Sequence, residues 1–314
     1  MLNTTPKRVV RPENYGQEGG NKGWVGAMTH VFENTAHQGQ HEAEKQMIDI
    51  LNKIETELSG SHPLVTDPNL KEHGSMVNKY EKMIKTGFED DDGLVKVEAG
   101  YRAKDRIRAT VISSKSNSAD LKDLKKKIID LIKKGGNEVE TRKGLDDSIK
   151  DNTTNPGYQD IKLYFQLKVP TNISKNPYLK NERFEIILVT AVTYAAKSGS
   201  EKLKKIINRS KKVKIGQFND KLFVGTFKNI GGEGHKFYKM DAVPRVKEYK
   251  DWHNDFPKYY YKYFRDNEKT ADKLALVSTL KVHKERIENA DPALVSGYYL
   301  KLMKEKIDKM LLDL

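Results

Sequence analysis

The sequence predicts an α+β protein whose β-sheet is partly parallel. Runs rich in β-branched and aromatic residues at 107–112, 161–167 and 184–190 are typical of strands. Between the first two runs, residues 118–134 repeat Leu and Ile at the spacing of an amphipathic helix. A strand, a helix and a further strand in this order are typical of a crossover connection, which joins parallel strands.

The region before the first strand divides into an arm and two helices. Residues 1–36 contain two glycine clusters and little periodicity, which predicts an extended arm over residues 1–40. Residues 41–58 place apolar side chains at helical spacing, and the following Ser-Gly-Ser-His-Pro sequence ends that helix. A second helix is predicted at about 75–86.

The second half of the sheet is predicted from two different patterns. Residues 161–167 alternate between apolar and polar side chains, as in a half-buried strand. Residues 184–190 are apolar on both faces apart from Glu185, which predicts a central strand. A helix at 191–208 and a short edge strand at 221–227 follow. Residues 41–230 are therefore expected to form the main domain.

Residues 231–314 are predicted to form a basic, aromatic-rich helical region. Gly135 and Gly136 end the helix at 118–134, whereas the glycines at 231–234 read as a loop. Two helices are expected in the last 45 residues or so, the second with Asp291 as its N-cap and Pro292 in its first turn.

Composition excludes several classes of protein. The 314 residues contain no cysteine, which excludes disulfides and thiolate chemistry and fits a reducing compartment. No apolar run reaches the roughly 18 residues that a membrane span needs. The first residues do not resemble a signal peptide. We therefore expect a cytoplasmic protein that does not enter a membrane.

The net charge of +13 is concentrated in one stretch of the chain. Residues 201–265 carry 17 Lys and Arg against seven Asp and Glu. Such a stretch attracts polyanions, including nucleic acid, but a solvated lysine-rich surface is an equally good interpretation. Aromatic and basic residues alternate at 249–265, a composition that suits nucleic-acid stacking. A small core beneath a helix is the favoured interpretation of these aromatics.

Chemistry-bearing residues gather near the starts of two predicted strands. Asp105 and Glu185 supply the carboxylates that Mg²⁺ uses together with substrate phosphates, provided that their strands are neighbours. The cations around Asp105 can neutralise charge on a transferred phosphoryl group. In an extended chain Asp105 points to the side opposite Arg108. Ion pairing of both acids with nearby cations is the alternative. The surrounding cations are Arg102, Lys104, Arg106 and Arg108.

Three short motifs carry a resemblance to a known family. They are Lys-Asp-x-x-Arg-x-Thr-Val from Lys104, Gly-Tyr-Gln-x-Ile from Gly157, and Glu-Ile-x-Leu-x-Thr from Glu185. In this order they resemble the synthetase domain of the RelA/SpoT family, most closely its compact members from phages and toxin systems. The resemblance covers about residues 70–210.

The resemblance implies a nucleotidyltransferase-like fold, with a mixed sheet of about five strands flanked by helices and helical extensions at both ends. It implies Mg²⁺-dependent transfer of pyrophosphate from ATP to the 3′ hydroxyl of a guanine nucleotide, in the cytoplasm of a bacterium or a phage-infected host. Asp105 and Glu185 would hold the metal, and Tyr158 would stack on the acceptor base. The remaining nucleotide-binding residues would be Gly157, Arg102, Lys104, Arg108, Lys162 and Ser75.

The chain departs from the family pattern at the donor site. Of the family's Arg-x-Lys-Ser stretch only Ser75 is present, and Lys162 stands where the family usually has histidine. No adjacent His-Asp pair occurs, so no hydrolase half is expected. Two alternatives stay open. One is the same chemistry on the 3′ end of tRNA, as in a toxin. The other is a catalytically degenerate nucleotide- or RNA-binding accessory protein of a phage.

Two further motifs are weaker. His37 and His41 with Glu44 could present metal ligands on one helix face, but surface residues are favoured. The glycines at 231–234 could cradle a phosphate through backbone amides. They lack the Gly-x-x-x-x-Gly-Lys-Ser/Thr pattern, so an ordinary loop is favoured.

Overall fold

The computed structural model describes twelve segments of the chain, and everything below concerns these residues. They are 8–10, 40–70, 94–96, 107–115, 118–140, 150–152, 155–166, 183–210, 212–233, 247–266, 269–291 and 297–314. The predicted helix at about 75–86 lies outside them, as does most of the predicted arm over residues 1–40.

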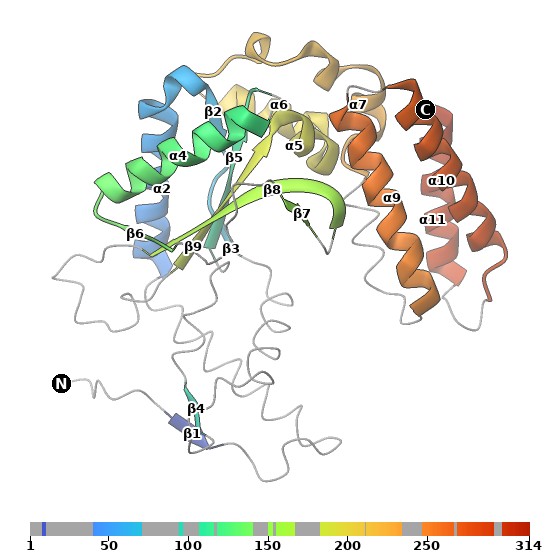
Figure 1. The fold of residues 1–314 in the computed structure, drawn as a ribbon, viewed down its shortest axis with the longest axis horizontal. Coiled ribbons are helices and arrows are strands. Elements are labelled where there is room, and N and C mark those ends of the chain that lie inside the picture. The colour runs from blue at the N-terminus through green and yellow to red at the C-terminus, as the bar shows by residue number, and fades with distance from the viewer. Residues whose placement is uncertain are drawn as a thin grey trace.

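A mixed sheet forms the centre of the fold (Figure 1). Its main path contains five strands, which confirms the expected fold class. Two short strands, β3 (Asn69–Leu70) and β7 (Lys150–Asn152), pair with β5 and β8 beside this path. A separate pair joins β1 (Arg8–Val10) to β4 (Leu94–Lys96). In spatial order the main path is β2 (Pro63–Val65), β5 (Ile107–Ser113), β9 (Arg183–Thr190), β8 (Asn155–Gln166) and β6 (Glu138–Glu140).

Only one neighbouring pair on the main path is parallel. Strands β5 and β9 run in the same direction, with Arg108 opposite Glu185 and Ile112 opposite Val189. The predicted parallel pairing therefore exists, but it joins β5 to β9 rather than to the strand that follows α4. That strand, β6, pairs antiparallel with β8.

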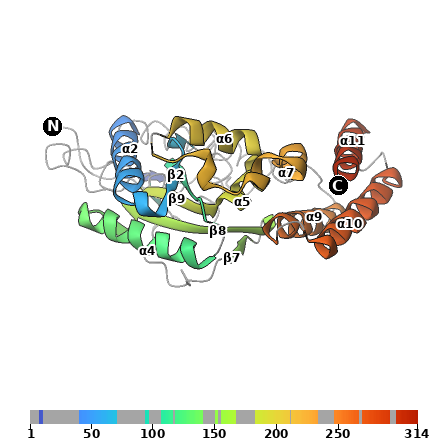
Figure 2. The same ribbon diagram turned by 90° about the horizontal axis from the view of Figure 1, so that it is seen from above.

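Helices α2 (Gln40–Glu57) and α4 (Ser118–Lys134) pack on one face of the sheet, called here the α4 face. Their apolar stripes pack on alternate residues of the three central strands, including Ile107, Phe184 and Phe165. Figure 2 shows α4 along this face. Helix α4 ends as predicted. Gly136 has φ of +78°, and the amides of Gly136 and Asn137 donate to Lys133 and Ile132 carbonyls, which is a Schellman cap.

Helices α5 (Ala191–Ser198) and α6 (Ser200–Arg209) lie on the other side of the sheet (Figure 2). The Thr190 side chain caps α5 by accepting from the amide of Thr193. One continuous helix over 191–208 was expected, and that expectation is wrong at Gly199. The backbone of Gly199 has φ of +92°, which is outside the helical region, so α5 ends there. Glycine occupies this position because a residue with a Cβ would adopt this φ only under strain.

The predicted edge strand at 221–227 is also wrong. This segment forms a 3₁₀ turn, η5 (Asp220–Phe223), and a short helix, α7 (Gly225–Ile230). Asn219 initiates the turn, because its side chain accepts from the amide of Lys221. Leu222 and Phe227 are both buried in one cluster. An odd separation of five would put them on opposite faces of a strand, whereas the two helical turns bring them together.

Three helices extend the molecule beyond the β7–β8 end of the sheet (Figure 1). They are α9 (Lys247–Arg265), α10 (Thr270–Glu288) and α11 (Gly297–Asp313). Most of the aromatics described in α9 are core residues: Phe256, Tyr260 and Phe264 are almost completely buried. This confirms the favoured interpretation and removes these rings as a stacking surface. Residues 292–296 lie outside the description, which leaves the predicted capping by Asp291 and Pro292 untested.

None of the helices within the described segments is long and apolar enough to cross a membrane.

A close contact between backbones joins α5, α6 and α7. Gly232 donates its amide to the Ala196 carbonyl, and the backbone of Gly231 lies against the α5–α6 junction. A Cβ on Gly231 would lie 2.2 Å from the Phe227 carbonyl oxygen and 3.2 Å from that of Ala195. Neither neighbour is a flexible side chain that can move aside.

We expect Gly231→Ala to destabilise the fold by about 1–3 kcal/mol, because the added methyl group overpacks a backbone contact. Urea denaturation followed by circular dichroism measures this. Gly216→Ala is the matched control, since nothing lies within 4 Å of a Cβ placed there. Equal midpoints for the two variants would contradict the contact.

Candidate nucleotide site

Glu185 is a buried carboxylate at the start of the central strand. Its side chain is 4% exposed, and the Tyr164 hydroxyl donates to its Oε1 at 3.0 Å. Arg108 on β5 and Tyr164 on β8 are its register partners on either side. Register partners share one side of a sheet, so these three side chains lie together on the side opposite α4. This side is called the Glu185 face.

The polar surface continues along β8 toward α5. Lys162, two residues from Tyr164, lies on the same face opposite Ile187. Its Nζ is 4.0 Å from the largely buried Asp160 carboxylate. Past this point the Glu185 face becomes apolar, because Ile112 and Val189 pack beneath α5 and α6. The polar part therefore occupies the end where the parallel strands β5 and β9 begin.

Tyr158 and Lys197 meet at the boundary between the polar and apolar parts. The Lys197 ammonium lies 4.4 Å from the centre of the Tyr158 ring and donates to its hydroxyl at 3.2 Å. Tyr261 of α9 packs edge-on against the same ring at 5.5 Å. Tyr158 is 3% exposed as a result. A base could stack on this ring only if Lys197 or α9 moved away.

Burial is the main cause of the shifted pKa values of Tyr158, Asp160 and Lys197. Desolvation lowers the pKa of Lys197 from 10.5 to about 8, and the nearby Arg108 and Lys162 act in the same direction, while Asp160 opposes them. Desolvation raises the pKa of Asp160, although Lys162 and Lys197 offset part of that shift. Burial, followed by the charge of Asp160, raises the pKa of Tyr158 well above 10. Tyr158 is therefore a neutral phenol.

The structure places five of the nine predicted site residues on three adjacent strands, β5, β9 and β8. Glu185, Arg108 and Lys162 lie on the Glu185 face, Tyr158 lies at its boundary, and Gly157 precedes Tyr158 in β8. The other four lie outside the described segments, so their positions stay predictions. They are Asp105, Arg102, Lys104 and Ser75.

Three residues of the site were not predicted. Asp160 and Tyr164 follow from strand alternation, because they lie two residues before and after Lys162 on the same face. Lys197 lies one helical turn after the buried Thr193, so helical spacing alone would have turned it toward the sheet. No sequence pattern indicated that its ammonium would cover Tyr158, because the two residues lie 39 positions apart.

The other motifs from the sequence do not form ligand sites in the described part of the chain. The amides of Gly231 and Gly232 already donate to Phe227 and Ala196 carbonyls, which favours an ordinary loop, while Gly234 lies outside the described segments. Glu44 lies on α2, but the side chains of His37 and His41 are not described. Within the twelve described segments, no cluster of three or more His, Cys, Asp or Glu is able to bind a metal ion.

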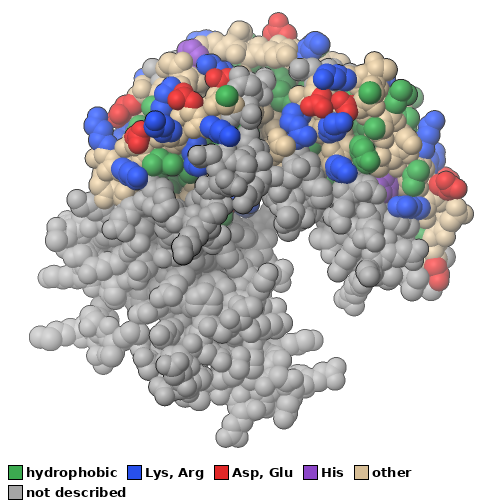
Figure 3. All heavy atoms as spheres, in the orientation of Figure 1, with side chains coloured by type: hydrophobic (Ala, Val, Ile, Leu, Met, Phe, Trp, Pro, Cys, Tyr) green, Lys and Arg blue, Asp and Glu red, His purple; other side chains and the backbone are tan. Residues whose placement is uncertain are grey.

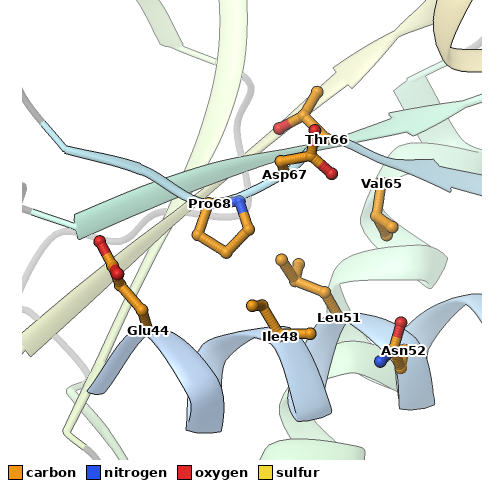
Figure 4. A pocket seen from close by; sticks show the side chains of 8 residues that line it. All are labelled: Glu44, Ile48, Leu51, Asn52, Val65, Thr66, Asp67 and Pro68. Atoms are coloured by element: carbon orange, nitrogen blue, oxygen red, sulfur yellow. The ribbon is translucent and has the colours of Figure 1, made fainter. Parts of the chain in front are cut away.

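A pocket of about 310 Å³ lies away from the Glu185 face, between α2 and the β2–β3 connection. Ile48 and Leu51 rise from α2 toward Val65 and Pro68 (Figure 4). Asp67 at its rim forms an ion pair with Arg209. Because none of its lining residues belongs to the Glu185 face, the pocket is not part of the candidate site.

The basic stretch contributes exposed lysines rather than a single ordered site. On the face shown in Figure 3, Lys and Arg are interspersed with Asp and Glu. On α6 the exposed lysines are Lys202, Lys204 and Lys205. This arrangement suits both predicted interpretations, a solvated surface and a polyanion-binding surface.

Comparison with known proteins adds little to this geometry. No family model matches the chain, and no curated protein matches it. One similar solved structure is described as the complex between the Type VI effector Tas1 and its immunity protein. It has a TM-score of 0.44 and 16% identity, over 75% of this chain and 97% of that chain. A likeness at this level supports no inference about function.

We expect the stability of the protein to depend on the titration of Lys197. Between pH 8 and 10.5 the unfolded state binds more protons at this residue than the folded state, so its contribution to stability rises with pH. The difference in unfolding free energy between the wild type and Lys197→Met should therefore shift by about 1–3 kcal/mol in favour of the wild type from pH 7.5 to 10.

Urea denaturation at several pH values measures this difference. Lys202→Met, at an exposed position of α6, serves as the control, and its difference from the wild type should stay constant. A flat profile for Lys197→Met would show that the ammonium is well solvated.

Proposed function

We propose that the chain is a Mg²⁺-dependent pyrophosphokinase of RelA/SpoT type, which transfers pyrophosphate from ATP to the 3′ hydroxyl of a guanine nucleotide. The supporting observation is the register of β5 and β9. The metal site inferred from the motifs requires the strand that follows Asp105 to be a neighbour of the strand that contains Glu185. They are adjacent and parallel, with Arg108 directly opposite Glu185.

The parallel direction matters as much as the adjacency. Strand β5 begins at Ile107 and β9 at Arg183, so both strands start at the same end of the sheet. Asp105 precedes Ile107 by two residues. If the two strands were antiparallel, the same motifs would place the two acids at opposite ends of the sheet.

The residues on this face suit a polyphosphate. Arg108, Lys162 and Lys197 bring three cations close to the buried carboxylates of Asp160 and Glu185, and clustered cations stabilise charge on a transferred phosphoryl group. Mg²⁺ needs only one or two protein carboxylates when substrate phosphates fill the other positions, so Glu185 with Asp105 would suffice. The metal would supply positive charge that neutralises the phosphates.

The proposal also requires a particular backbone conformation just before β5. Ile107 points to the α4 face, where it is completely buried, while Glu185 points to the opposite face. An Asp105 that continued the alternation of β5 would share the side of Ile107. Sharing a metal with Glu185 therefore requires the backbone to leave the extended conformation between residues 105 and 107.

Transfer of label tests the reaction. The full-length protein is incubated with Mg²⁺ and ATP labelled in the γ-phosphate, together with GDP, GTP or tRNA. We expect label on a guanine nucleotide. Label on tRNA would instead establish the same chemistry on the tRNA 3′ end. Absence of transfer at every Mg²⁺ concentration would favour a degenerate nucleotide-binding protein.

We expect Glu185→Gln to lower transfer by about 100-fold or more, because the amide keeps the Tyr164 hydrogen bond but loses the charge. Glu233→Gln is the matched control. Glu233 is also a buried glutamate, 6% exposed, but its partner is Lys306 of α11 at 2.8 Å. The control should keep its activity at temperatures where it is folded. Equal losses in both variants would remove Glu185 from the site.

A metal-binding measurement tests Asp105 separately. Mn²⁺ is titrated into the protein with a non-hydrolysable ATP analogue and monitored by electron paramagnetic resonance. We expect Asp105→Asn and Glu185→Gln each to weaken Mn²⁺ binding by about tenfold or more, since even outer-shell changes cost that much. If only Glu185→Gln has an effect, Asp105 is not a metal ligand.

A further inference from the structure

Lys197 occupies an unusual position for a lysine. It lies in the last turn of α5, and its ammonium is partly withdrawn from water. Among the described residues, it contacts the Tyr158 hydroxyl and the face of the Tyr158 ring. A neutral phenol and a π-face stabilise an ammonium less than a carboxylate does.

The neighbouring cations on the Glu185 face are also weakly paired. Arg108 donates through Nε to the Asn69 side chain at 3.2 Å, which is a neutral partner. Lys162 is 4.0 Å from Asp160, at the outer limit of an ion pair. Within the described segments, no carboxylate lies within ion-pairing distance of Arg108 or Lys197. Burial is the main cause of the lowered pKa of Lys197; repulsion by Arg108 and Lys162 adds to it, while Asp160 and Glu185 oppose it.

A phosphate group would stabilise the Lys197 ammonium more strongly than the Tyr158 phenol does. It brings two or more negative charges and several acceptor oxygens, and it is small enough to approach a partly exposed ammonium. Lys197 would then exchange one weak hydrogen bond to a phenol for a charge-assisted bond. Its flexible four-carbon stem allows the ammonium to move without a change in α5.

Such a movement has a second consequence, because Lys197 covers Tyr158. The ammonium lies over one face of the ring, and Tyr261 packs against the ring in a T-shaped arrangement. Withdrawal of Lys197 would free the ring face on which a flat base stacks.

We propose that Lys197 is an anion-binding residue, which leaves Tyr158 to bind a phosphate group of the substrate and thereby uncovers the Tyr158 ring. This inference rests on the proposed function, because it takes the ligand of the Glu185 face to be a polyphosphate. It adds an order of events in which phosphate binding precedes base stacking.

Pyrophosphate alone tests the proposal, because its binding does not depend on transfer. Isothermal titration calorimetry with the full-length protein at pH 7.5 should show pyrophosphate binding. Lys197→Met should weaken that binding by about 10- to 100-fold, the loss of one charge-assisted hydrogen bond. Lys197→Arg should restore it to within a few-fold. Lys202→Met, which removes a charge from the exposed face of α6, should bind like the wild type.

A second measurement follows Tyr158 directly. The protein is labelled with 3-fluorotyrosine, and the ¹⁹F resonance of Tyr158 is assigned from its absence in Tyr158→Phe. Pyrophosphate should shift this resonance in the wild type. In Lys197→Met the resonance should begin at a different position and stay there when pyrophosphate is added.

The outcomes separate this proposal from the proposed function. Unchanged pyrophosphate affinity in Lys197→Met, or a Tyr158 resonance that pyrophosphate leaves in place, would overturn the role of Lys197 even if the wild type transfers label. Lysine-dependent pyrophosphate binding without transfer to any acceptor would support the role of Lys197 and overturn the pyrophosphokinase.

Discussion

The parallel pairing of β5 with β9 is the constraint on which the rest of the site depends. It brings together two segments that are almost eighty residues apart in the chain and aligns their starts at one end of the sheet. Hydrogen bonds of the ladder fix this register, and a slip of one residue would turn Glu185 into the α4 face. Arg108, Glu185 and Tyr164 form a row only because both ladders of β9 hold their register.

The Glu185 face illustrates how one side of a sheet can serve both packing and binding. Toward α5, α6 and α9 it carries apolar residues, which pack into a large core with the aromatics of α9. Toward the starts of β5 and β9 it carries charges. The opposite face shows no such division over the same strands, because Ile107, Phe184 and Phe165 pack there beneath α2 and α4. The candidate site therefore lies on one face only, from the starts of β5 and β9 to the boundary with the apolar half.

The C-terminal helices contribute more to the site than their distance in sequence suggests. Tyr261 of α9 contacts Tyr158, and the hydroxyl of the neighbouring Tyr260 donates toward the Ala196 and Ile230 carbonyls at 2.9 and 2.7 Å. Tyr260 thus ties α9 to the end of α5, one residue before Lys197. The helical region 231–314 was expected to be an extension. Its helix α9 instead forms part of the wall beside Tyr158.

The sequence by itself determined the local elements and the residue types of the site. Helical periodicity placed α2 and α4 to within a residue or two, and strand patterns located β5 and β9, because each depends on neighbours close in the chain. It failed at 221–227, where Asn219 and a buried pair of side chains favoured turns over a strand. Local patterns also identified Glu185 as the exceptional acid in an apolar strand.

Only the tertiary structure decided which of these residues meet. The register of β5 and β9 set Arg108 beside Glu185, and the packing of α5 and α9 against β8 placed Lys197 over Tyr158. These contacts join residues between 39 and about a hundred positions apart. They depend on long-range ladders and core packing, which leave no periodic trace in the sequence of either partner.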